Sequence, residues 1–103
     1  MTVQKEAKLS QKIVKAIHET FDNSEAYKNY GTMMGKPKLD IGGSVDGIRF
    51  EIEVKNPGSK PTPRQQARID ALKKINVITG CVTSVEEAIV LIQLGINNFM
   101  TKM

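Results

Sequence analysis

Three residues in the middle of the chain have side chains suited to hydrolytic chemistry on a phosphate ester: Asp40, Glu53 and Lys55. The last two lie in residues 48–55, where apolar and polar side chains alternate with the period of a β-strand. Asp46-Gly47 directly precedes this stretch, and that dipeptide favours a two-residue hairpin turn. The pattern predicts two antiparallel strands, the second with one polar face.

The predicted turn determines which residues face each other. Continued pairing away from the turn puts Asp40 directly opposite Glu53. Opposed side chains lie about 4.5–5.5 Å apart at Cβ on the same face of the sheet. Lys55 follows on that face, about 7 Å along the strand. A bulge at Gly42-Gly43 would shift the register by one residue and turn Asp40 toward the core instead.

Two carboxylates so close together can both ionise only beside a compensating cation. Oxygen ligands with room for water suit Mg²⁺ or Mn²⁺, which polarise a phosphoryl oxygen and lower the pKa of a bound water. A neighbouring lysine can orient or deprotonate the attacking water, or stabilise the transition state. The alternative is a solvated strand face with incidental charges, because Arg49 and Glu51 lie on it too.

Glu6 and Gln65 are predicted to point toward the same place. Glu6 shares the spacing of the apolar stripe of the first helix, where an acid needs a partner such as a metal site. Its other interpretation is a first-turn glutamate favoured by the helix dipole. The spacing of Gln65 from the apolar residues of its own helix predicts that its side chain faces the core, toward the site. Gln65 also fits a capping box that begins at Thr62, and one side chain can hardly fill both roles.

The remaining reactive side chains give weaker indications of a functional site. His18 falls off the apolar stripe and is predicted to lie on the surface, and Cys81 is predicted to be core. With no Cys/His cluster, a zinc site is excluded. Gly42-Gly43 lacks the following helix that a phosphate-binding loop requires.

The elements that position these residues follow from periodicity and end signals. A four-residue apolar spacing predicts a helix over 6–21, and residues 27–32 fit either a short strand or an ordered loop. Thr62 and Pro63 start a helix that runs to about Lys74, a buried strand covers 77–82, and a last helix from 85 ends near Gly95. The order is α-β-β-β-α-β-α, an α/β fold with a mixed sheet in one domain over 1–103.

Composition sets the broad class. The chain has 103 residues, 40% of them hydrophobic, which allows one small core. There is no run long enough to span a bilayer and no apolar segment of a signal peptide, and the single cysteine suits a reducing cytosol. We expect a cytoplasmic, non-secreted protein that contacts no membrane. A net charge of +4 favours a polyanionic partner, but only mildly.

At these residues the chain resembles the virus-type replication-repair (VRR-NUC) domain of the PD-(D/E)XK nuclease superfamily. The family pattern is a Gly-x-Pro-Asp segment, an Ile-Glu-Val-Lys strand, a short loop and a Pro-x-Gln helix start. The matching segments here are Asp40, Glu53-Val54-Lys55 and Lys60-Pro61-Thr62-Pro63-Arg64-Gln65. In the family the Asp follows Pro directly, whereas Lys38 and Leu39 separate Asp40 from Gly35-Lys36-Pro37 here.

The resemblance implies a restriction-endonuclease-like core and a Mg²⁺-dependent endodeoxyribonuclease, for which Mn²⁺ would substitute. Asp40, Glu53 and the Val54 carbonyl would bind the metal, Lys55 would be catalytic, and Glu6 and Gln65 would complete the site. We expect Lys60, Arg64 and Arg68 to contact DNA. Lone domains of this kind are found in phage, and they are implied to be homodimers that cut branched DNA such as Holliday junctions. We therefore expect the protein to act in the cytoplasm of a bacterial cell or of a phage-infected host cell.

Two questions stay open. The last helix has apolar residues on all sides, which fits burial against a partner chain or against the tail of the same chain, residues 96–103. The alternative function is a catalytically silent nuclease-like module that binds DNA without cutting, and a structural or RNA-binding basic protein is a further rival. Incubation with plasmid or junction DNA, with Mg²⁺ and with EDTA, separates these.

Overall fold

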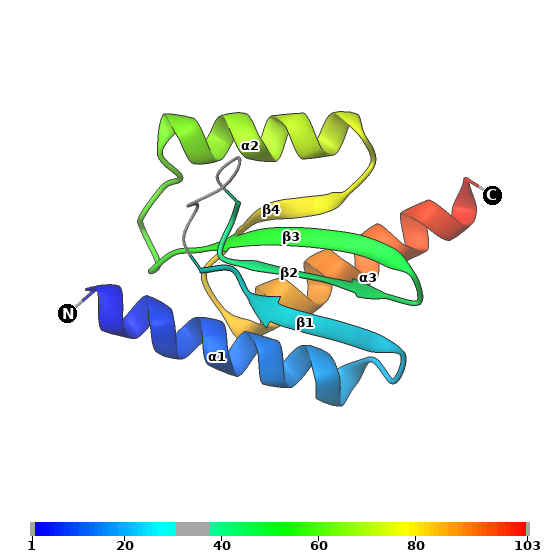
Figure 1. The fold of residues 1–103 in the computed structure, drawn as a ribbon, viewed down its shortest axis with the longest axis horizontal. Coiled ribbons are helices and arrows are strands. Elements are labelled where there is room, and N and C mark those ends of the chain that lie inside the picture. Colours follow the sequence, from blue (N-terminus) through cyan, green and yellow to red (C-terminus); the bar gives the residue numbers. More distant parts are fainter. Residues whose placement is uncertain (1, 31–37, 103) are drawn as a thin grey trace.

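The computed structural model describes residues 2–30 and 38–102, and it arranges them in seven helices and strands (Figure 1). In chain order these are α1 (Thr2–Thr20), β1 (Ser24–Lys28), β2 (Ile41–Val45), β3 (Ile48–Val54), α2 (Pro63–Lys74), β4 (Ile78–Val82) and α3 (Val85–Thr101). The order α-β-β-β-α-β-α is the one that the sequence predicts. No helix in the described part of the chain is long and apolar enough to cross a membrane.

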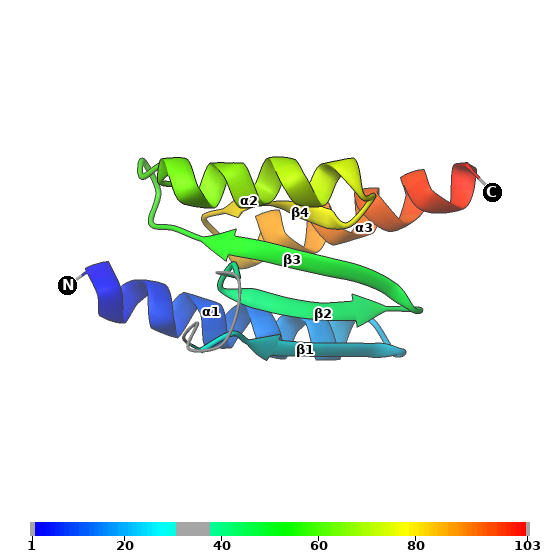
Figure 2. The same ribbon diagram turned by 45° about the horizontal axis from the view of Figure 1, so that its top comes forward.

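The strands form one mixed sheet in the order β1-β2-β3-β4. The first three strands are antiparallel, and β4 joins β3 in parallel after the crossover through α2. Helix α2 covers one face, and α1 and α3 contact each other on the opposite face (Figure 2). The main core lies between the sheet and the α1/α3 layer, around the fully buried Ile13, Phe50, Ile52 and Ile92. A smaller cluster of Leu39, Ile69 and Leu72, with Cys81 packed against it, lies under α2.

The β2–β3 hairpin has the predicted turn and register. Asp46 and Gly47 both have positive φ, 54° and 80°, as a tight hairpin turn of this kind requires. Ile41 pairs with Ile52 without a bulge. Gly43 needs to be glycine because a Cβ there would lie 1.9 Å from the Glu25 carbonyl oxygen of β1. The hairpin therefore keeps the polar residues of β3 on the face that α2 covers.

Three element boundaries differ clearly from the sequence prediction, the first being the start of α1, which is Thr2 rather than Glu6. The first strand begins at Ser24 rather than near Tyr27, because its pairing with β2 starts with Ser24 opposite Val45. Part of the predicted strand or loop over 27–32 lies outside the described residues. Helix α3 does not end near Gly95 but continues to Thr101. A Cβ at Gly95 would lie 2.6 Å from Ile78, so this glycine allows close packing of α3 on β4 rather than ending the helix.

Candidate active site

Asp40 and Glu53 lie side by side at one end of the β2–β3 ladder. Asp40 directly precedes Ile41, whose pairing with Ile52 is the last of the β2–β3 ladder. The Oδ2 atom of Asp40 accepts a hydrogen bond from the Val54 N–H at 3.0 Å. Glu53 is buried, with only 3% of the residue exposed. The hairpin thus brings together the two carboxylates that the register argument puts opposite each other.

The two carboxylates repel each other in this setting. Burial raises the pKa of Glu53 to about 8, and the neighbouring Asp40 carboxylate contributes to the shift. The Lys55 ammonium acts in the opposite direction but offsets only part of it, with its Nζ 3.8 Å from Glu53 Oε2. Near neutral pH the pair therefore needs a proton or a bound cation between its members.

Gln65 combines the two roles that looked incompatible in the sequence. Its Oε1 accepts from the Thr62 N–H at 2.9 Å, and its backbone N–H donates to Thr62 Oγ1, which completes a capping box. Its Nε2 meanwhile donates to Glu53 Oε2 at 2.8 Å. Because the amide has an acceptor end and a donor end, one side chain starts α2 and holds Glu53 at once.

Lys55 and Glu6 extend the cluster beyond the end of β3. The Lys55 backbone N–H donates to the Val82 carbonyl of β4 at 3.0 Å, which anchors its side chain beside Glu53. Glu6 of α1 is half-buried, and its Oε2 accepts from the Asn56 N–H at 3.4 Å, next to Lys55 along the chain. The structure thus brings Glu6 to the end of β3 that carries the other candidate residues.

The donor set fits a hard divalent cation. Asp40 and Glu53 supply carboxylate oxygens, and the Val54 carbonyl lies between Glu53 and Lys55 in the chain. Within residues 2–30 and 38–102 no group of three or more His, Cys, Asp or Glu side chains could hold a metal ion. A site with few protein oxygens and several waters is the kind that Mg²⁺ occupies. An ion of this kind would relieve the mutual repulsion of the two carboxylates.

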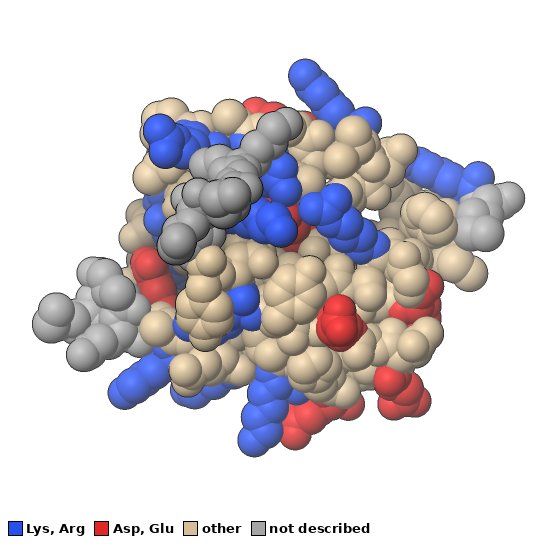
Figure 3. Space-filling model, in the orientation of Figure 1, with Lys and Arg blue, Asp and Glu red and all other residues tan. Residues whose placement is uncertain are grey.

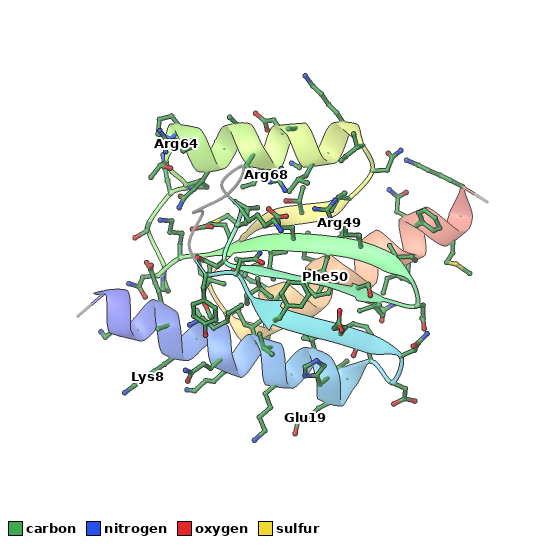
Figure 4. The ribbon with its side chains drawn as sticks, viewed as in Figure 1. Lys8, Glu19, Arg49, Phe50, Arg64 and Arg68 are labelled. Atoms are coloured by element: carbon green, nitrogen blue, oxygen red, sulfur yellow. The ribbon has the colours of Figure 1, made fainter. Side chains whose placement is uncertain are left out.

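The predicted DNA-binding residues divide into two kinds. Lys60 and Arg64 are exposed, in the loop before α2 and in its first turn, and basic side chains gather around this helix (Figure 3). Arg68 instead points toward the sheet, where its guanidinium bonds both oxygens of Glu51 (Figure 4). The alternative interpretation of this face, a solvated strand surface with incidental charges, does not hold for Glu51, which is buried. The family motif segment Gly35-Lys36-Pro37 lies outside the described residues.

Comparison with known proteins relates this fold to one family. A solved structure described as a VRR_NUC domain superposes with a TM-score of 0.67; the match covers 86% of this chain and 95% of that chain, at 23% sequence identity. No family model matches the sequence, and no curated protein matches it significantly. The chain therefore has the fold of a VRR_NUC domain, as the resemblance in its motifs predicts.

Proposed function

We propose that this protein is a metal-dependent endonuclease that hydrolyses phosphodiester bonds in DNA. The observation that carries the proposal is the buried Asp40–Glu53 pair beside Lys55, at the positions that match the nuclease motif. The fold shared with a VRR_NUC domain supports the same class of activity. The raised pKa of Glu53 adds a physical reason for a cation at this place.

Each residue has a part in this chemistry. Asp40, Glu53 and the Val54 carbonyl would hold Mg²⁺, or Mn²⁺ in its place, and the ion would supply charge stabilisation and an activated water. Gln65 orients Glu53 through its Nε2 hydrogen bond. Lys55 has its ammonium beside Glu53 and is suited to orient the attacking water or to stabilise the charge that develops on the phosphate. Glu6 and the backbone N–H of Asn56 close the site on the α1 side.

The substrate and assembly are further parts of the proposal. Lys60 and Arg64 are exposed in the loop before α2 and in its first turn, next to Gln65, and we propose that they bind DNA phosphates. We propose a homodimer that acts on branched DNA in a bacterial or phage-infected cytoplasm, since paired sites suit two symmetric cuts in a four-way junction. What supports the dimer is α3, on which Val90 and Leu94 are 54% and 61% exposed.

The proposal is tested with purified protein and three labelled substrates: a four-way junction, a linear duplex and a single strand. We expect cleavage of the junction with Mg²⁺ or Mn²⁺ and none with EDTA, and no cleavage by the Glu53→Gln variant. Glu25→Gln, an exposed glutamate on β1, is the matched control and should retain activity. Metal-independent binding of the junction without cutting would favour the silent DNA-binding module instead.

A further inference from the structure

Glu51 is the most fully hydrogen-bonded carboxylate on the strand that carries the site. It is 2% exposed, and its Oε2 accepts from the Leu39 N–H and from Arg68 Nε, both at 2.9 Å. Its Oε1 accepts from a terminal nitrogen of Arg68 at 2.9 Å and from Arg49 at 3.3 Å. Both oxygens are thus occupied by donors, and the Arg68 contact is bidentate, the geometry that fixes a guanidinium most firmly.

These contacts join the three segments that carry the candidate metal ligands and their support. Glu51 is two residues before Glu53 on β3, so the two side chains share a face. Leu39 directly precedes Asp40, and Arg68 lies one turn after Gln65 on α2. A single buried carboxylate therefore ties the Asp40 segment and the Gln65 helix to the strand of Glu53.

Other contacts also restrain the Asp40 segment, from β1 and from α2. Asn29, just after β1, donates its Nδ2 to the Leu39 carbonyl and its backbone N–H to the Asp40 carbonyl, both at 2.8 Å. Leu39 itself is buried under α2 with Ile69 and Leu72. Asp40 precedes the paired residues of β2, so the Leu39–Glu51 bond provides a restraint that the strand ladder does not.

We propose that Glu51 and Arg68 are a positioning pair, which holds Asp40 and Gln65 at the places where they act on the Glu53 site. This inference rests on the proposed metal-dependent function. It also changes the role of Arg68: a guanidinium engaged on both Glu51 oxygens, with its side chain 22% exposed, orients the site rather than binding DNA.

Arg68→Met removes the two guanidinium bonds while keeping an extended side chain over the sheet. We expect it to weaken Mn²⁺ binding, measured by calorimetry without DNA, by about 10–100-fold, the usual effect of losing a residue that orients metal ligands. The Val54 amide resonance should also move, because that N–H donates to Asp40 Oδ2. Arg68→Lys, which can restore the charge but only one bond, should lie between Arg68→Met and the wild type.

Two variants on the same helix serve as controls. Arg64→Met should weaken DNA binding in EDTA yet leave Mn²⁺ affinity and the Val54 amide unchanged, whereas Arg68→Met should show the reverse. Lys74→Met, exposed at the end of α2, should change neither. If Arg68→Met fails to fold, the double variant Glu51→Gln/Arg68→Met is used in its place. It removes both charges of the pair, and the same losses are expected.

The outcomes separate the two proposals. A folded Arg68 variant with wild-type Mn²⁺ affinity and an unmoved Val54 amide would overturn the positioning role. Wild-type protein that binds no Mn²⁺ and cuts no DNA would overturn the proposed function. In that case the Val54 amide would still report whether the pair holds Asp40 in place.

Discussion

Replacing Glu53 with Gln should stabilise the metal-free protein although it destroys the proposed metal site. The Glu53 carboxyl is buried beside Asp40, and its pKa is raised from an ordinary 4.5 to about 8. At pH 7 the unfolded chain has lost this proton while the folded chain retains it. At about 1.4 kcal/mol per pKa unit, this difference lowers the free energy of unfolding by up to about 3 kcal/mol. A neutral amide at this position removes this destabilisation, and its oxygen can still accept the hydrogen bond from Gln65 Nε2.

The sign of the effect sets its pH dependence. A carboxyl with a raised folded-state pKa favours the folded state most below pH 4.5, and this contribution is lost as the pH rises toward about 8. The stability difference between Glu53→Gln and the wild type should therefore be small near pH 4.5, grow through neutral pH and level off above about 8. In EDTA at pH 7, where the expected difference is up to about 3 kcal/mol, the melting temperature of the variant should exceed that of the wild type by roughly 10–20 °C.

Added Mg²⁺ or Mn²⁺ should reverse the order. If the proposed site binds the ion only in the folded state, the wild type should gain stability, whereas the variant lacks a proposed ligand and should show little shift. Glu51→Gln is the matched control, because it alters a buried glutamate on the same strand whose pKa is lowered. It should destabilise the protein by about 1–3 kcal/mol at neutral pH. A Glu53→Gln variant no more stable than the wild type in EDTA at pH 8 would refute the carboxylate-repulsion argument.

Three further predictions concern catalysis, DNA binding and assembly. Lys55→Ala should abolish cleavage while junction binding stays within a few-fold, because the ammonium acts mainly on the transition state; equal losses in gel-shift and cleavage assays would make Lys55 a phosphate anchor. Lys60→Ala and Arg64→Ala should each weaken binding and lower the slope of log affinity against log salt by about one, and an unchanged slope would place the DNA elsewhere. Leu94→Glu should convert a dimer to a monomer in light scattering, with coordinated junction cutting lost before nicking; a wild-type mass of 11.4 kDa at micromolar concentration would contradict the dimer.

The hairpin and its register were predictable because they depend on neighbours in the chain. Asp46-Gly47 sets the turn, and the alternation over β3 sets which side chains share a face, so the juxtaposition of Asp40 and Glu53 follows from short-range signals. The capping box of Thr62 and Gln65 was predictable for the same reason. The roles of these residues in catalysis stay predictions.

The features that the sequence did not reveal depend on packing between distant elements. Gly95 has the residue type of a helix end, but its contact with Ile78 of β4 makes it an interior residue of α3. The Glu51–Arg68 pair spans β3 and α2, and its formation depends on the angle at which the helix crosses the sheet. No spacing in the chain encodes that angle.

Glu51 and Glu53 show why residue type and alternation alone could not identify the site. Both are buried glutamates on the same face of β3, two residues apart. Glu51 has a guanidinium on both oxygens and a lowered pKa, so its charge is already compensated within the protein. Glu53 has a second carboxylate beside it, a lysine only at 3.8 Å and a raised pKa, so its charge is not compensated. A buried acid whose charge the fold leaves uncompensated takes either a proton or an external cation, and this difference supports the proposed roles of Glu53 in metal binding and of Glu51 in positioning.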